Sequence, residues 1–225
     1  MFARISKKLR ERGVGGTLRD LLARLRRDLY SEETSIVLLK DLNEVLQVRR
    51  PTGVVFEDLR PEHLPQLYEL NREREAPIVD RRFAAYFEAG FHGFIALLEG
   101  RAIGYYWWVD AAGAAEFPDL RDYDMGFELG PGDVYGSDFY ILEAHRDGRL
   151  AGEMLARVEG GLADRGYSRL WGFVLADNRP ARWLYESRGY ERLWTHKRKK
   201  RFFMSRVENL PDPSTIIEGG WDADR

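Results

Sequence analysis

Short runs of apolar residues in this chain alternate with segments whose apolar positions repeat at helical spacing. Residues 34–39 and 54–59 have the apolar and β-branched composition of strands. Pro61 then starts a helix that carries three leucines on one face, and a second helix is predicted for residues 80–88. This part of the chain therefore predicts strands and helices in alternation.

The central part predicts a hairpin and a long loop. Residues 93–98 and 102–109 are apolar, β-branched and aromatic, and a Glu-Gly-Arg turn joins them. The second run contains the aromatic stretch Tyr105 to Trp108. Because side chains alternate along a strand, we expect about half of these rings in the core and the others along an acceptor pocket or acyl groove. Residues 110–132 are rich in glycine, proline and acids and predict a loop.

The second half repeats the strand and helix pattern. Residues 134–142 predict a strand, followed by a helix that ends near Gly166. Residues 170–176 predict the next strand, which leads into a short helix with a glycine stop at Gly189 and then another strand. No internal repeat and no second domain boundary is visible between residues 50 and 205.

The first 30 residues form a basic amphipathic segment, with nine Lys or Arg against three Asp or Glu and with leucines at helical spacing. Such a helix can lie on an anionic membrane, dock an acidic acyl carrier protein, or pack on the protein's own core or in a homodimer contact. Self-packing or a dimer contact is the favoured interpretation. We divide the chain into a basic helical extension at 1–33, a main domain at 34–207 and an acidic extended tail at 208–225.

Composition excludes several kinds of chemistry. The chain has 225 residues, 44% of them hydrophobic, which is enough for one full core. It has no cysteine, and its four histidines lack metal-ligand spacing, so no disulfide, thiolate or metal site is expected. A net charge of −2 gives no general attraction for nucleic acid, and the basic run 196–201 is interpreted as a strand with solvated charges.

Nothing in the hydropathy pattern predicts a membrane span or a secretory signal. We therefore expect a cytoplasmic protein, and peripheral contact with a membrane through residues 1–30 stays open as an alternative.

The strand at residues 134–142 runs into a turn and a helix start that suit an anion. Unpaired backbone N–H groups and the positive end of the helix dipole converge at such a point. The turn and first helical residues are Arg146, Asp147, Gly148, Arg149, Leu150, Ala151 and Gly152. A pyrophosphate would fit there, although the segment alone is an ordinary strand-turn-helix connection.

A second informative run follows the strand at residues 170–176. It places Asn178 at a helix start, Tyr185 on that helix and Gly189 at its end. Considered alone, Asn178 is a helix cap and Tyr185 is a half-buried helical tyrosine.

Together, these two segments resemble the signature regions of the GNAT superfamily of acyl-CoA-dependent N-acyltransferases. Arg146 and Ala151 match the ends of that family's phosphate turn, whereas Arg149 stands where the family has its central glycine. Gly148 and Gly152 can restore backbone freedom, or the Arg149 guanidinium can bind a phosphate. Over roughly residues 50–205, the resemblance implies a mixed α/β fold, with a twisted, mostly antiparallel sheet of about six or seven strands and helices on both faces.

The resemblance also implies a coenzyme A site. The turn from Arg146 to Gly152 would hold the pyrophosphate, and the backbone of Tyr140, Ile141 and Leu142 would pair with the pantetheine arm like an added strand. The helix from Asn178 to Tyr185 would lie beside the thiol. Acetyl-CoA or a longer acyl-CoA is the expected co-substrate, without a metal ion.

Transfer of an acyl group to an amine needs a proton donor for the leaving thiolate and a base for the amine. A phenol with a pKa near 10 is protonated at neutral pH, so Tyr185 is the candidate acid. Asp138 is the candidate base, directly or through water. Its rivals are Glu128, Asp133, Glu143 and an ordered water, and strand alternation does not decide which face of the sheet meets the acceptor.

We therefore predict an enzyme that transfers an acetyl group from acetyl-CoA to the primary amine of an unidentified small-molecule acceptor in a ternary complex. One alternative is transfer of a longer acyl group from acyl-CoA or acyl carrier protein to an amino acid or amino sugar, which the basic N-terminal segment and the aromatic strand motivate. Another is a non-catalytic acyl-CoA-binding or membrane-associated module.

Overall fold

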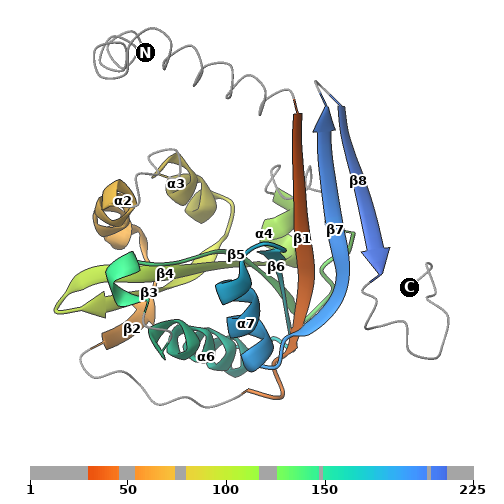
Figure 1. The fold of residues 1–225 in the computed structure, drawn as a ribbon. Coiled ribbons are helices and arrows are strands. Elements are labelled where there is room, and N and C mark those ends of the chain that lie inside the picture. The colour runs from red at the N-terminus through yellow and green to blue at the C-terminus, as the bar shows by residue number, and fades with distance from the viewer. Residues whose placement is uncertain are drawn as a thin grey trace, which may run out of the picture.

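The fold is a twisted sheet of eight strands in the order β2-β3-β4-β5-β6-β1-β7-β8 (Figure 1). The structure, a computed structural model, describes residues 30–45, 54–73, 80–116, 126–146, 149–201 and 204–211. The strands are β1 (Tyr30–Asp41), β2 (Val54–Asp58), β3 (His92–Leu98), β4 (Arg101–Asp110), β5 (Asp133–Ile141), β6 (Arg169–Leu175), β7 (Glu191–Arg201) and β8 (Met204–Pro211). Every neighbouring pair is antiparallel except β5 and β6, which are parallel.

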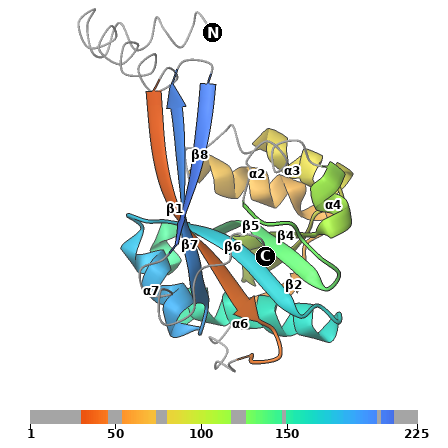
Figure 2. The same cartoon turned by 90° about the vertical axis from the view of Figure 1, so that its right-hand side faces the viewer.

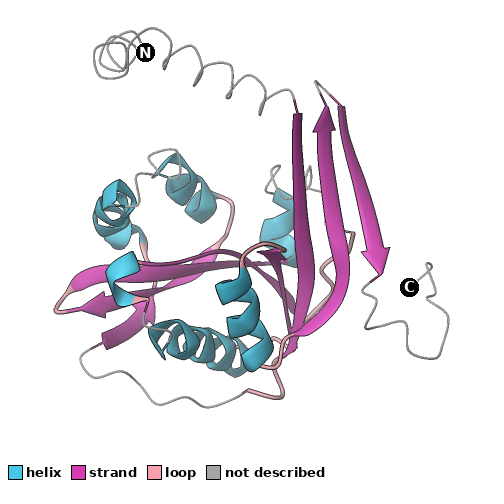
Figure 3. Ribbon diagram, in the orientation of Figure 1, coloured by secondary structure: helices cyan, strands magenta, loops and turns pink. Residues whose placement is uncertain are grey.

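Helices cover both faces of the sheet, as the sequence predicted (Figures 2 and 3). One face carries α2 (Leu64–Glu73), α3 (Asp80–Glu88) and α4 (Ala111–Glu116), and the other carries α6 (Arg149–Asp164) and α7 (Arg179–Ser187). Short 3-10 turns precede α2 at Pro61–His63 and follow β5 at Glu143–His145. Two apolar clusters, one on each side of the sheet, hold these helices in place.

Most of the predicted elements are confirmed. The hairpin is β3 and β4, and the predicted strands around residues 134–142 and 170–176 are β5 and β6. Helices α3 and α6 lie where the apolar spacing placed them. The sheet has one strand more than the upper expected number, because β8, which was expected to be partly tail, pairs with β7.

Two boundaries and one loop differ from the prediction. Strand β1 begins at Tyr30, inside the expected extension at 1–33, and β8 crosses the expected tail boundary at residue 208. The expected loop at 110–132 contains α4, whose Ala-rich sequence favours a helix. The predicted amphipathic helix before residue 30 lies outside the described residues.

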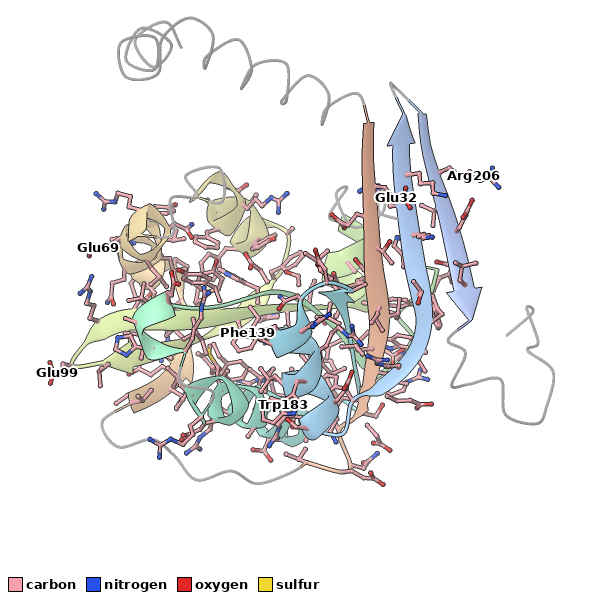
Figure 4. The ribbon with its side chains drawn as sticks, viewed as in Figure 1. Glu32, Glu69, Glu99, Phe139, Trp183 and Arg206 are labelled. Carbon is pink, nitrogen blue, oxygen red and sulfur yellow. The ribbon has the colours of Figure 1, made fainter. Side chains whose placement is uncertain are left out.

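Charged side chains explain why β1, β7 and β8 extend further than their apolar runs. Lys197 lies 3.9 Å from Glu32 of β1, and Lys199 lies 3.8 Å from Glu208 of β8. The ends of these strands project past the helices, with Glu32 and Arg206 among their side chains (Figure 4). The basic run 196–201 lies in a strand, as predicted; His196 is buried, and Lys197, Arg198 and Lys199 are half-buried.

Candidate active site

The two parallel strands in the centre of the sheet separate partway along their length. Strands β5 and β6 pair from Asp133 opposite Arg169 to Gly136 opposite Gly172. Beyond this point, residues 138–141 pair with β4, and residues 173–175 pair with β1. A gap in the hydrogen-bonded ladder therefore begins between β5 and β6 after the two glycines.

A β-bulge in β5 marks the point of separation. Trp107 of β4 pairs with Asp138, whereas Trp108 pairs with Gly136, so Ser137 is an extra residue in the ladder. An extra residue bends the strand and increases its local twist. The bulge at Ser137 therefore turns the end of β5 away from β6.

The backbone of β5 offers polar groups to this gap. The Leu142 N–H donates to the Ile103 carbonyl of β4 at 2.8 Å, so strand alternation turns the Ile141 carbonyl to the opposite edge. There it accepts a hydrogen bond from Arg146 Nε at 2.7 Å. The backbone groups of Phe139 and Ile141 thus face the gap, whereas those of Tyr140 and Leu142 face β4.

The turn after β5 leads into the N-terminus of α6. The Arg146 guanidinium lies 5.1 Å from the centre of the Tyr140 ring, while Asp147 and Gly148 lie outside the described residues. Helix α6 starts at Arg149, which is exposed, and its first turn contains no acidic residue to offset the positive helix end. Because Arg149 is helical, its position does not need the backbone freedom of a glycine.

The other predicted turn residues belong to the first turns of α6. Leu150 is buried in the core, and Ala151 and Gly152 are half-buried. A Cβ on Gly152 would lie 3.8 Å from Leu184 of α7, so the two helices pack closely at this level. The start of α6 and helix α7 therefore flank the same side of the gap.

Helix α7 carries Tyr185, and its ends are fixed as the sequence predicted. The Asn178 side chain accepts a hydrogen bond from the Ala181 N–H at 3.2 Å, and Gly189 ends the helix with φ of 77°. The Tyr185 ring packs edge-to-face on Tyr190, with ring centres 4.9 Å apart. Tyr185 is thus held on the α6/α7 side of the sheet.

The hydroxyl of Tyr106 lies beside Gly136, where the gap begins, and Tyr185 is near it. It occupies the space that a side chain at Gly136 would fill, at the last paired residue of β5. Burial raises the pKa of Tyr106 well above its usual value, and nearby Tyr185 and Glu159 raise it further. Burial and Glu159 also raise the pKa of Tyr185, so its phenol stays protonated at neutral pH.

A buried ion pair, which the sequence reasoning missed, supports this side of the site. Glu159 of α6 and Arg188, just after α7, are both buried, and Arg188 Nε lies 3.3 Å from Glu159 Oε1. Burial raises the pKa of Glu159, and Arg188 and Lys40 oppose that shift. The available signal was a glutamate four residues after Leu155, on a helix face that is mostly apolar.

Asp138 lies on the opposite face of the sheet, below α2 and α3. The Tyr105 hydroxyl donates to Asp138 Oδ2 at 3.4 Å, and the carboxylate is partly exposed. Tyr185 and Asp138 thus reach the sheet from different faces. A thioester carbonyl in the gap would have one on each side.

The rival carboxylates differ in their surroundings. Asp133 is buried and engaged by Arg169 at 2.6 and 2.9 Å and by the Gly130 N–H at 2.9 Å, so its role is structural. Glu128 and Glu143 are exposed. Of the four carboxylates considered, Asp138 is the one beside the bulge where the strands part.

The aromatic strand is a correction to the sequence reasoning. Tyr105, Tyr106, Trp107 and Trp108 are all at most 3% exposed, so all four belong to the core. Phe83 packs on both Tyr105 and Trp107 from α3, and Tyr167 packs on Trp108 from the other side. Rings were expected along an open groove, but both faces of this strand are covered by helices.

A family model confirms the resemblance of the two signature segments. The model of the acetyltransferase (GNAT) family matches residues 55–190, more than half of the chain. The chain belongs to the GNAT family. The matched region contains the β5/β6 gap, the turn into α6 and all of α7.

Solved structures show the same fold. A functionally unknown conserved protein from Staphylococcus epidermidis has a TM-score of 0.56 at 9% identity, over 82% of this GNAT chain and 68% of its own. A GCN5-related N-acetyltransferase from Sphaerobacter thermophilus has a TM-score of 0.54 at 15% identity, over 86% and 57%. The chain therefore spans between 57% and 68% of these two proteins. No curated protein matches it in sequence.

Other features of this GNAT domain lie away from the gap. A cavity of about 270 Å³ lies between α2 and the β3–β4 turn, and one of about 380 Å³ lies around Arg165 and Tyr167. Within the described ranges, no group of three His, Asp or Glu side chains is arranged to hold a metal ion.

Proposed function

We propose that the protein transfers an acetyl group from acetyl-CoA to the primary amine of a small acceptor. The observation that carries this proposal is the β5/β6 gap, with the α6 N-terminus and Tyr185 on one face and Asp138 on the other. Acetyl-CoA is the co-substrate of the family. The gap would let donor and acceptor approach the same carbonyl from opposite faces of the sheet.

The donor would be held mainly by backbone groups. Residues 146–152 and the positive end of α6 suit the pyrophosphate. The gap-facing backbone of Phe139 and Ile141 suits the amides of the pantetheine arm, with the Arg146 side chain moving off the Ile141 carbonyl. Tyr140 and Leu142 would then fix the strand through β4.

The reaction would proceed by direct transfer. A base near Asp138, or Asp138 itself, removes one proton from the acceptor ammonium, and the neutral amine attacks the thioester carbonyl. A C–N bond forms and the C–S bond breaks, while the attacking nitrogen loses its second proton to water. The Tyr185 phenol gives its proton to the departing thiolate, so coenzyme A leaves as the thiol. Tyr185 then regains a proton from solvent, and the net reaction releases one proton. Juxtaposing donor and acceptor supplies much of the rate.

A short acyl group is favoured over a long one. The rings that motivated a long-chain donor are at most 3% exposed, and the cavity that Trp108 borders, around Arg165 and Tyr167, lies away from the gap. An acetyl group needs little space beyond the gap itself.

A thiol-release assay tests this function. The purified chain is given acetyl-CoA or decanoyl-CoA with a panel of amino acids, amino sugars and polyamines, and acylated product is detected by mass spectrometry. Acetyl transfer to at least one amine is expected, with decanoyl-CoA much slower. Faster transfer from decanoyl-CoA would support the long-chain alternative. Binding of acetyl-CoA without transfer to any amine would support a non-catalytic module.

The proposals about residues 1–30 concern a part of the chain outside the described residues. We keep an acidic carrier protein, a membrane surface and a second copy of the chain as proposed contacts of this segment. Within the described part of the chain, no helix is both long and apolar enough to cross a membrane.

A further inference from the structure

Helix α3 stands over the Asp138 side of the gap. Its Tyr86 is buried, and the ring centre lies 5.2 Å from that of Trp107. Trp107 is the residue of β4 that pairs with Asp138 of β5. The inner face of α3 is therefore fixed directly above the bulge that opens the gap.

The Tyr86 hydroxyl lies among groups of opposite charge. Burial raises the pKa of Tyr86, and the Asp138 carboxylate raises it further, while the Arg82 guanidinium opposes the shift. Arg82 precedes Tyr86 by four residues, so both side chains lie on one face of α3. A guanidinium and a carboxylate therefore flank the same hydroxyl at the edge of the gap.

The two charged groups are accessible, whereas the residues that hold them are not. Arg82 is exposed and Asp138 is partly exposed, but Tyr86 and Tyr105 are at most 5% exposed. Tyr105 donates to Asp138, and Tyr86 lies near both Arg82 and Asp138, so an exposed cation and a partly exposed anion flank the same buried phenols. Such a pair matches a ligand that carries both charges itself.

We propose that the acceptor is an amino acid or a similar small amine with a carboxylate close to its nitrogen. Asp138 would receive the ammonium group, and Arg82 would bind the carboxylate through paired N–H donors. This inference rests on the proposed acetyl transfer and specifies its acceptor. A polyamine would instead place a second positive charge beside Arg82, which disfavours it.

Matched acceptors test the inference. Each amino acid is compared with its carboxamide, which keeps the amine and the side chain but lacks the negative charge, and kcat/KM is measured with saturating acetyl-CoA. The parent enzyme should favour the acid over the amide by about 10- to 100-fold, as expected for a hydrogen-bonded charge pair. Arg82→Gln should bring this ratio close to one, because the variant lowers kcat/KM for the acids more than for the amides.

Two further variants keep the result interpretable. Arg82→Lys retains the charge and should keep part of the preference, because an ammonium lacks the paired geometry of a guanidinium. Arg157→Gln removes an exposed arginine on the opposite side of the sheet, whose guanidinium lies over Phe56, and should leave the ratio as in the parent. Acetyl-CoA affinity and melting temperature report on the integrity of each variant.

The possible failures are distinct. Equal or better acetylation of amides, amino sugars or polyamines by the parent would overturn the inference and leave acetyl transfer intact. An acid preference that survives Arg82→Gln would also overturn it, because another cation would then bind the carboxylate. Absence of transfer to every amine would instead remove the proposed function, and the acceptor assignment with it.

Discussion

At the scale of single residues, the protonation of Tyr185 decides what it can do. Burial raises the pKa of its phenol, and the Glu159 carboxylate raises it further. The group is therefore neutral throughout the physiological range and can donate a proton but cannot accept one. This fits an acid for the departing thiolate and excludes Tyr185 as the base for the amine.

Tyr185→Phe is expected to lower kcat by about 10²- to 10⁴-fold, because the variant keeps the ring on Tyr190 but has no proton to donate. The KM for acetyl-CoA and the melting temperature should change little. Steady-state thiol release measures both constants. Tyr167→Phe, which removes a hydroxyl 3.4 Å from Asp110 and remote from the gap, serves as the control. An unchanged kcat in Tyr185→Phe would exclude the phenol from the mechanism.

Residues of the site differ in how far the sequence could predict them. Asn178, Tyr185 and Gly189 were predictable because cap, helix and glycine stop follow one another within twelve residues. Glu159 and Arg188 are 29 positions apart and meet only when α6 and α7 pack together. Tyr106 fills the space at Gly136 from a neighbouring strand. Local signals carry no information about such contacts.

At the scale of elements, the end of β5 depends on a glycine that accommodates a tyrosine. A methyl group at Gly136 would overlap the Tyr106 hydroxyl and lie 2.8 Å from its Cζ atom. The ring cannot withdraw easily, because Tyr106 is 3% exposed and packs on Phe139 with ring centres 5.5 Å apart. The last paired residue before the gap therefore tolerates no side chain.

Gly136→Ala should lower the free energy of unfolding by about 1–3 kcal/mol through overpacking. Combining it with Tyr106→Phe, which removes the overlapping hydroxyl, should recover part of this loss, as a double-mutant cycle in urea measures. Gly172→Ala is the matched control on β6, since its added methyl group would meet no described atom within 4 Å. An equal effect of both alanine substitutions would contradict the packing explanation.

Elements themselves were predictable where a regular apolar pattern spans them. Strands β3 to β6 and helices α3 and α6 follow their apolar runs closely. The ends of β1 and β8 do not follow an apolar run, because there the pairing involves charged residues such as Glu32 opposite Lys199. A strand held by cross-strand charge pairs has no apolar alternation to reveal it.

At the scale of the whole molecule, strand β1 joins the strands β2 to β6 on one side of it to β7 and β8 on the other. It pairs with β6 on one side and with β7 on the other, so Ser35 lies opposite Leu175, 140 positions later. The sequence predicted a strand there but not this place in the sheet, since nothing local specifies a partner so distant. On one face of the joined sheet, Tyr106, Tyr185 and Tyr190 pack in one apolar cluster with α6, beside Glu159.

These tyrosines make the stability of the fold sensitive to alkali. Burial raises the pKa values of Tyr106, Tyr185 and Tyr190 above the usual value near 10 that they regain on unfolding. Above about pH 10 the unfolded chain loses these protons while the folded chain keeps them, so stability falls as pH rises. Below that pH both states hold the protons, and the three phenols add no pH dependence.

Each phenol should lower the free energy of unfolding by about 1.4 kcal/mol per pH unit in this range, or about 4 kcal/mol per unit for the three together. Urea unfolding between about pH 8 and about pH 11 measures the slope, and tyrosinate absorbance reports the ionisation itself. Tyr185→Phe removes one of these groups and should make the slope shallower by about 1.4 kcal/mol per pH unit. Stability that stays level to about pH 11 would mean that these phenols ionise as readily in the folded protein as in the unfolded chain, which their burial beside Glu159 opposes.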